Sequence, residues 1–318
     1  MNLLEQLKQY TQVDADSVDF DIITQFKPVD GTTNPTLIFA AAQKKKYAGL
    51  VDAALEYGRK KGDNFESRLA ESMDMLAVNF GIEILKIVPR RVAIAVDARL
   101  SYDMHGSLTK ARKIIKLFED KGIPRCKILI KLTSSWEGIK AAEQLEKEGI
   151  HCNLTLLFSI AQAIAGAEAK VQIISPFVGR IYDWHKKDRG VDFIPPDEDP
   201  GIQFVNYIYN YYKKFGYRTE VMGASFRNIG QIIELAGCDL LTIPPNLLSE
   251  LENNQDVLVR KLDPEKSKAT DVQKIHLDAK NFRWMQNEDA MAVEKFSEGI
   301  RSFTFDIIKL EEFIAAKL

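Results

Sequence analysis

Short apolar runs alternate along this chain with longer amphipathic stretches. The short runs are rich in Val, Ile and Leu, which favours buried strands, and most of the stretches between them place apolar residues at helical spacing. The predicted strands cover residues 13–17, 28–34, 91–97, 126–132, 152–158, 171–177, 220–225 and 238–244. The predicted helices between them include residues 102–120, 136–147, 159–168, 201–215 and 228–236. Eight strands alternating with helices predict a closed parallel (β/α)₈ barrel, the TIM-barrel fold, and not an open sheet.

Two segments are longer than this repeating unit requires. Residues 35–89 have enough apolar periodicity for two or three helices, and residues 281–318 for a helical pair. We therefore expect one barrel domain over residues 1–318, with a helical insertion at about 35–89 and a C-terminal helical extension at about 281–318. Both additions are expected to pack around the outside of the barrel. The charged, proline-containing stretch 185–200 is expected to be a solvated loop, with a lid as the alternative.

The composition of the chain limits the classes of ligand and partner that we expect. The chain has 43 Lys and Arg against 45 Asp and Glu, so no overall field attracts nucleic acid, and any anion must be bound by local groups. The sequence contains no apolar run of 18 residues, so no membrane-spanning helix is predicted. The N-terminus has no secretory pattern, so a cytoplasmic location is expected. Cys126, Cys152 and Cys238 lack metal or redox spacing and are expected to be buried thiols, and the four histidines predict no metal site either.

One lysine interrupts the pattern of a buried strand. Lys131 is the only charged residue between Lys127 and Glu137. Burial disfavours an ammonium group and lowers a lysine pKa, and a neutral amine can attack a ketone to form an imine that withdraws electrons from the neighbouring carbon–carbon bond. The alternative is a structural lysine that extends its amine to solvent at a strand end or pairs with a buried carboxylate. The run by itself leaves both interpretations open.

Polar residues recur on one face of the predicted strands. Residues of equal parity share a strand face, and most of these lie near the C-terminal strand ends, where TIM-barrel enzymes build their active sites. Individually, Asp16 could cap a helix, Asn34 could be a turn residue before proline, and Arg180 and Arg227 could form surface ion pairs. Together around Lys131 they indicate an active site. The residues of these shared faces include Asp14, Asp16, Thr32, Asn34, Asn153, Thr155, Ser175, Phe177, Ser225 and Arg227.

Five segments resemble those of the transaldolases that form a Schiff base. They are DGTTNPTLI at 30–38, ILIKLTSSWEGIKAAEQL at 128–145, HCNLTLLFS at 151–159, ISPFVGRIYDWH at 174–185 and VMGASFRN at 221–228. The similarity extends over essentially the whole chain. It implies transfer of a dihydroxyacetone unit from sedoheptulose 7-phosphate or fructose 6-phosphate to glyceraldehyde 3-phosphate or erythrose 4-phosphate, in the non-oxidative pentose phosphate pathway. It implies no cofactor, and members of the family are often homodimers.

The resemblance also implies roles for single residues. Lys131 would form the Schiff base, and Asp16 would take the proton from the C4 hydroxyl as the C3–C4 bond breaks. Phe177 matches transaldolases, whereas related aldolases tend to carry tyrosine there, which favours transfer over simple cleavage. The residues implied to bind the sugar or its phosphate are Thr32, Asn34, Asn153, Ser175, Arg180, Ser225 and Arg227.

The third strand departs from the family pattern. The family reads roughly STEVDARLSYD where residues 93–103 read AIAVDARLSYD, so Ala95 replaces a glutamate. In the family that glutamate and the threonine matching Thr155 hold a water that relays protons during imine formation. Loss of a positioned acid–base group typically costs about 10²–10⁴ in rate.

Three explanations of Ala95 stay open. One is a substitution introduced to slow the enzyme, although Ala93 and Ile94 also differ from the pattern. Another is relocation of the acid to Asp14, which has the same parity as Asp16, unless Asp14 faces solvent at the start of its strand. The third is a weakly active or non-catalytic sugar-phosphate-binding barrel. Among enzymes, the alternative is a Schiff-base aldolase that releases free dihydroxyacetone.

Overall fold

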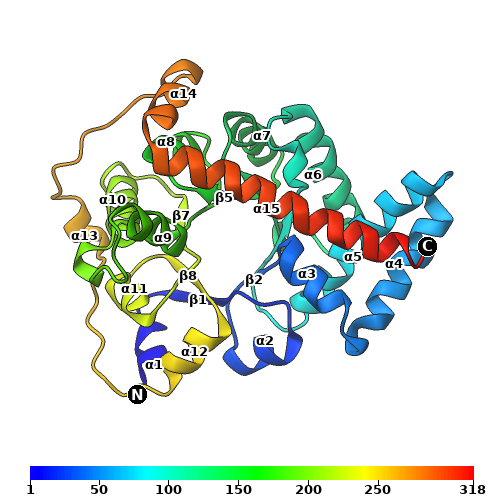
Figure 1. Cartoon of the computed structure of the whole chain (residues 1–318), viewed down its shortest axis with the longest axis horizontal. Coiled ribbons are helices and arrows are strands. Elements are labelled where there is room, and N and C mark those ends of the chain that lie inside the picture. The colour runs from blue at the N-terminus through cyan, green and yellow to red at the C-terminus, as the bar shows by residue number, and fades with distance from the viewer.

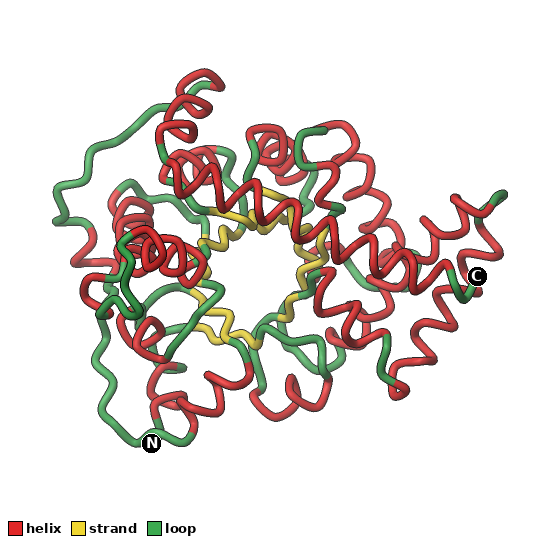
Figure 2. The backbone as a smooth tube through the Cα atoms, viewed as in Figure 1, coloured by secondary structure: helices red, strands yellow, loops and turns green.

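Eight parallel strands form a closed ring in the computed structural model, which describes residues 1–318. The strands pair in chain order, β1 to β8, with β8 closing on β1, so the predicted TIM barrel is confirmed (Figure 2). Every predicted strand is present, most of them shorter by a few residues. The strands are β1 Gln12–Ala15, β2 Gly31–Thr32, β3 Val92–Ala95, β4 Ile128–Thr133, β5 His151–Leu157, β6 Ile173–Pro176, β7 Glu220–Gly223 and β8 Leu240–Ile243.

Helices surround this ring on its outside (Figure 1). The five helices that the periodicity predicts are all present, within about two residues of their predicted ends. Shorter helices that the periodicity did not resolve complete the layer. The surrounding helices are α1 Leu3–Leu7, α2 Phe20–Phe26, α6 Met104–Glu119, α7 Trp136–Lys147, α8 Ile160–Glu168, α9 Val178–Asp188, α10 Pro200–Lys214, α11 Ile229–Glu234, α12 Pro245–Glu252 and α13 Pro264–Ser267.

The apolar runs form strands because both strand faces are buried. Ile94, Ile130 and Leu154 are fully buried and belong to the large core between the strands and the helices. The opposite faces contribute a small apolar cluster of Ala93, Leu129, Ile173, Met222 and Leu240. Each strand is covered by helices on its outer face and by other side chains inside the barrel. Its sequence therefore does not alternate between apolar and polar residues, except near its C-terminal end.

The insertion and the extension both consist of helices. The insertion contains α3 Pro35–Ala42, a 3₁₀ turn at Lys45–Tyr47, α4 Ala48–Lys61 and α5 Phe65–Leu85, and α5 packs on β3. The extension contains α14 Ala279–Glu288 and α15 Ala290–Ala315.

Helix α15 of the C-terminal extension does not pack against the helical layer alone, since it also contacts β5. This 26-residue helix crosses the molecule from α14 past α9 and β5 to α3 and α5 (Figure 1). Its side chains reach the barrel mouth because buried apolar residues lie along most of its length, from Met291 and Phe296 to Leu310 and Ile314. The helix thus runs along one side of the barrel mouth and contributes Phe303 to the cavity there.

The stretch 185–200 is not a loop throughout. Helix α9 continues to Asp188 and ends before Gly190, whose φ is +66°. The buried residues of α9 lie in its first turns, and its last turn is charged. An apolar pattern therefore does not indicate how far this helix extends. The remainder contains a 3₁₀ turn at Pro196–Glu198, and Asp199 caps α10 by accepting from Gly201 N at 2.7 Å.

Two compositional expectations can be compared with the fold. Cys152 and Cys238 are buried, but Cys126 is exposed because it lies in the 3₁₀ turn Arg125–Lys127 before β4. None of the helices is long and apolar enough to span a membrane.

Candidate active site

A cavity of about 440 Å³ lies at the C-terminal ends of the strands. It brings together most of the residues that the sequence indicated, from five different strands or the segments that follow them. These residues are Asp16, Thr32, Asn34, Lys131, Ser175, Phe177, Arg180, Ser225 and Arg227.

Lys131 lies inside the barrel with its side chain 9% exposed. Its Nζ has one hydrogen-bond partner, Thr32 Oγ1, at 3.4 Å, and no ion pair. Burial lowers the pKa of Lys131, Asp16 raises it and Arg180 lowers it further. Neither structural alternative applies, since the amine neither extends to solvent nor pairs with a buried carboxylate. A larger fraction of this amine is therefore neutral than in an ordinary lysine.

Asp16 follows β1 and is the only carboxylate that lines the Lys131 cavity. Burial raises the pKa of Asp16, while Lys131 and Arg180 lower it. The helix-cap interpretation of Asp16 is wrong, because Asp19 caps α2 by accepting from Asp21 N at 3.2 Å. A carboxylate with a raised pKa can accept a proton and return it near neutral pH.

Asn34 and Ser175 present polar groups beside Lys131. Asn34 caps α3, since its Oδ1 accepts from Leu37 N at 2.9 Å, and this bond leaves its NH₂ group for the cavity. Ser175 Oγ donates to Asn153 Oδ1 at 2.7 Å. Asn153 is buried in register with Lys131 and does not line the cavity itself. Asn153 therefore reaches the site through Ser175.

The far end of the cavity is cationic. Arg180 has no hydrogen bond or ion pair within the protein, and its guanidinium carbon lies 5.0 Å from the ring centre of Phe177 and 5.8 Å from that of Phe303. Burial lowers the pKa of Arg180, and the nearby Arg227 lowers it further. A partly buried guanidinium without a partner is ready to bind an anion.

A tight backbone contact shapes this end. Gly179 N donates to Ser225 O at 2.8 Å, and a Cβ on Gly179 would lie only 1.9 Å from that oxygen. Ser225 itself has φ of +64°, a conformation that costs of order 1–3 kcal/mol for a residue with a side chain. The first turn of α9, which carries Arg180, is thus fixed against the loop that carries Ser225 and Arg227.

Arg227 is paired in this structure. Its Nε and Nη2 donate to Asp183 Oδ2 at 2.9 and 2.8 Å, and about two-fifths of each side chain is exposed. The ion-pair alternative is therefore correct for Arg227, which still lines the cavity, and wrong for Arg180.

Besides Asn153, three of the residues that the sequence indicated lie outside the cavity lining. Thr155 is buried, and its Oγ1 has no hydrogen-bond partner. Ala95 is in register with Lys131 and borders a second, neighbouring cavity. Asp14 is 1% exposed, so the solvent-facing alternative is wrong, and its Oδ1 accepts from Asp30 N at 2.8 Å.

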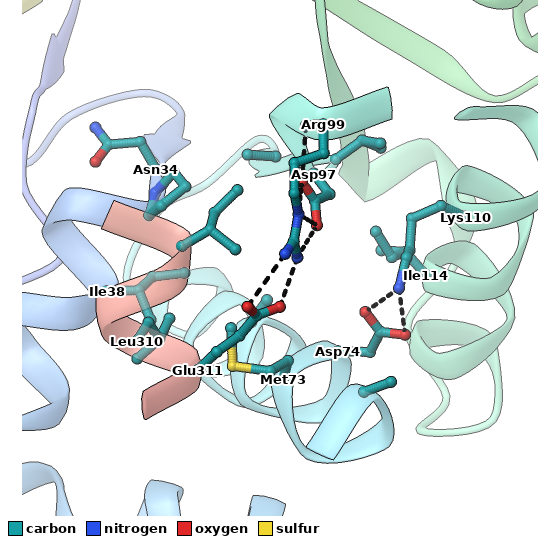
Figure 3. Close-up of a pocket in the computed structure, with 16 residues that line it drawn as sticks. Asn34, Ile38, Met73, Asp74, Asp97, Arg99, Lys110, Ile114, Leu310 and Glu311 are labelled. Carbon is teal, nitrogen blue, oxygen red and sulfur yellow. Dashed lines mark hydrogen bonds and ion pairs between the residues drawn. The ribbon is translucent and has the colours of Figure 1, made fainter. Parts of the chain in front are cut away.

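The second cavity, of about 170 Å³, lies between Ala95 and helices α3, α5, α6 and α15 (Figure 3). Its lining includes Ile38, Met73, Ile114 and Leu310, and Asn34 lines both this cavity and that of Lys131. The charged side chains here all have partners. Arg99 joins Asp97 and Glu311, and Lys110 Nζ lies 2.8 Å from Asp74 Oδ1.

Three residues in or next to the site that the sequence did not single out are Thr242, Asp183 and Phe303. Thr242 lines the Lys131 cavity and shares parity with Leu240, so the face rule could have found it. Asp183 lies within a matched segment but was not singled out. Phe303 comes from α15, and no local signal connects that helix to the barrel mouth.

Comparisons with known proteins show the family of this chain. Residues 13–314 match the family model "Transaldolase/Fructose-6-phosphate aldolase". A transaldolase of Homo sapiens is 54% identical over 316 residues, which cover 99% of this chain and 94% of that protein. A transaldolase of Aliivibrio fischeri strain MJ11 is 57% identical over 316 residues, with 99% of both chains covered. One of Vibrio vulnificus strain YJ016 is 56% identical over 317 residues, covering 100% of this chain and 99% of its own. The chain therefore belongs to the transaldolase/fructose-6-phosphate aldolase family of enzymes.

Proposed function

We propose that this chain is a transaldolase, which moves a dihydroxyacetone unit between sugar phosphates through a Schiff base on Lys131. The observation that carries the proposal is the buried amine of Lys131, which has no ion pair and shares one cavity with a single carboxylate, Asp16. Family membership of the whole chain supports the same reaction.

The chemistry follows from the two groups. The neutral amine of Lys131 attacks the ketone of the donor, and the carbinolamine loses water to give a protonated imine. Asp16 takes the proton of the C4 hydroxyl, the C3–C4 bond breaks, and its electrons neutralise the imine as an enamine. The first aldose leaves. The enamine then attacks the aldehyde of the acceptor, and Asp16 returns the proton. The imine serves as the electron sink.

The remaining lining residues fit a phosphorylated sugar. Thr32, Asn34 and Ser175 would bind the hydroxyls of the three-carbon fragment near Lys131, with Asn153 holding Ser175 in place. The cationic end with Arg180 would bind the phosphate through charge-assisted hydrogen bonds, together with Ser225 and Arg227.

Phe177 bears on the fate of the enamine. Its ring lies under Arg180 and, unlike a tyrosine, carries no hydroxyl that could position a water to protonate the enamine. This favours transfer to an acceptor over release of free dihydroxyacetone.

The proposal extends to substrates and setting. The donors would be sedoheptulose 7-phosphate or fructose 6-phosphate, and the acceptors glyceraldehyde 3-phosphate or erythrose 4-phosphate, in the cytoplasmic non-oxidative pentose phosphate pathway. We also propose a homodimer, which analytical ultracentrifugation of the full chain tests.

Borohydride reduction in the presence of fructose 6-phosphate tests the Schiff base. We expect a dihydroxyacetone-sized adduct on the peptide that contains Lys131, located by mass analysis. An unmodified Lys131 would overturn the proposal and leave a binding barrel. Assays with and without an acceptor separate the enzyme alternatives, because steady release of free dihydroxyacetone without an acceptor would indicate an aldolase.

A further inference from the structure

The Lys131 cavity contains only one carboxyl group that could donate a proton. Formation and hydrolysis of an imine each need a proton donor for the carbinolamine oxygen, in addition to the base that breaks the carbon–carbon bond. Asp16 is the only carboxylate that lines the cavity, and the register partner of Lys131 on β3 is Ala95. A second donor is not visible among the lining side chains, apart from hydroxyl groups.

Besides Thr155 Oγ1, two buried oxygen atoms near the site have no hydrogen-bond partner. They are Asp14 Oδ2 and Thr242 Oγ1, on residues that are 1% and 6% exposed. Asp14 and Thr242 lie directly opposite each other in the register of β1 and β8. A buried polar atom without a partner typically costs about 1–3 kcal/mol, so two such atoms on facing residues, which make no direct hydrogen bond, indicate a water bound between them.

We propose that Asp14 and Thr242 form a proton-donating pair that serves Lys131 from inside the barrel. Thr242 lines the Lys131 cavity, whereas Asp14 does not, so Thr242 is the member that reaches the reacting oxygen. Asp14 acts through Thr242 and is a positioning and supplying residue. The inference rests on the proposed Schiff-base function.

The surroundings of Asp14 favour its protonated form. Its Oδ1 accepts from Asp30 N, which leaves Oδ2 to carry the proton. Burial and the carboxylate of Asp30 raise the pKa of Asp14, and Arg91 and Arg90 lower it. Arg91 donates to Asp30 and Glu220, so its charge is largely shared with those two carboxylates. From β8 the facing residue is Thr242, which carries no charge.

The proposed step balances. As the carbinolamine C–O bond breaks, the nitrogen lone pair forms the C=N bond and the leaving oxygen takes a proton from Thr242 Oγ1 to become water. In the same step Asp14 Oδ2 reprotonates Thr242 through the water between them and becomes a carboxylate. In imine hydrolysis the attacking water gives a proton back along the same path, and Asp14 is neutral again.

Four variants test the pair in the full-length enzyme. Asp14→Asn keeps the acceptor for Asp30 N, and Thr242→Val keeps the side-chain volume. We expect each to lower kcat about tenfold to hundredfold with little change in KM, below the full effect of a directly positioned acid. The double variant should be no slower than the slower single variant, because the two residues act in one path. As a control, Ser72→Ala removes another buried, unpartnered hydroxyl on α5 and should leave kcat unchanged.

The pH profile separates this role from a structural one. The wild-type kcat should fall at high pH as Asp14 loses its proton, and Asp14→Asn should lose that descending limb. Adding Ala95→Glu to Asp14→Asn should restore most of the rate. Unchanged kcat in Asp14→Asn, or additive losses in the double variant, would overturn the pair. If borohydride traps an adduct on wild-type Lys131 while these variants behave normally, only this inference fails; if no adduct forms at all, the proposed function fails first.

Discussion

The two cavities on either side of Asn34 differ in what their charged groups do. In the larger cavity Lys131 and Arg180 lack ion pairs, although both are largely buried. In the smaller one Arg99 and Lys110 are fully engaged by carboxylates of α5, α15 and the end of β3. Unpaired buried charge is costly and persists where a ligand supplies the partner, whereas paired charge around an apolar floor holds helices together. The contrast assigns binding to the first cavity and structural support to the second.

The largest expected effect is on Lys131. Lys131→Met removes the nucleophile and should lower transaldolase turnover by more than about 10³-fold, with no borohydride adduct. The matched control is Lys127→Met, at the other end of the same run, where Nζ donates to Pro89 O at 2.8 Å. Turnover in Lys131→Met close to that of the control would contradict the assignment.

Arg180 should show the next largest effect. Arg180→Gln removes the unpaired cation, and we expect KM for phosphorylated sugars to rise about 10- to 100-fold, because a charge-assisted bond contributes about 1.5–3 kcal/mol. Steady-state kinetics with fructose 6-phosphate and with unphosphorylated fructose measure this, since the unphosphorylated sugar should be insensitive to the change. An equal loss for both sugars would argue against phosphate binding here.

Lys131→Met should also change stability in a pH-dependent way. The pKa of Lys131 is lower in the folded protein than in the unfolded chain. Below the ordinary lysine pKa the unfolded chain therefore binds more protons than the folded protein. The free energy of unfolding of the wild type consequently decreases as the pH falls from about 10 towards the folded pKa. We expect the variant to be more stable at neutral pH by about 1.4 kcal/mol for each unit of lowering. Urea unfolding of both proteins at pH 7 and 10 measures the difference, which should shrink at pH 10.

A smaller effect is expected at Asp183, which competes with phosphate for Arg227. Asp183→Asn keeps the shape but removes the charge, so KM for phosphorylated donors should fall by several-fold, about 1 kcal/mol or less because both side chains are well exposed. Asp188→Asn at the far end of α9 is the control. A rise in KM would mean that Asp183 is needed to orient Arg227.

The smallest effect is expected in the second cavity. Arg99→Gln breaks the bridge from Asp97 to Glu311 and should cost about 0.5–1 kcal/mol of unfolding free energy, since Arg99 is well exposed. Hydrogen exchange should show faster opening of α15 with KM unchanged. A rise in KM in this variant would break the division between the two cavities.

The barrel was predictable because both strand faces are buried, so each strand appears as an apolar run that contrasts with its amphipathic neighbours. Strand parity also placed Lys131, Asp16 and Ser175 in one cavity. Parity could not show how far a side chain reaches, and Asn153 shares that inward face but lies behind Ser175.

Long-range contacts account for most of what the sequence left out. The contribution of Phe303 depends on the path of α15 across the mouth, which no local pattern encodes. The pairing of Asp14 with Thr242 depends on closure between the first and last strands, so only the register reveals it. The end of α9 was not predicted because its last turn, residues 185–188, contains no apolar residue.

The crossing of α15 has a consequence for synthesis of the chain. The last barrel strand ends at Ile243, while Phe303 lies about 60 residues later, so a ribosome finishes the strands roughly several seconds before it releases the helix that carries Phe303. A newly made chain therefore has all eight strands, Lys131 included, before Phe303 can pack beside Arg180.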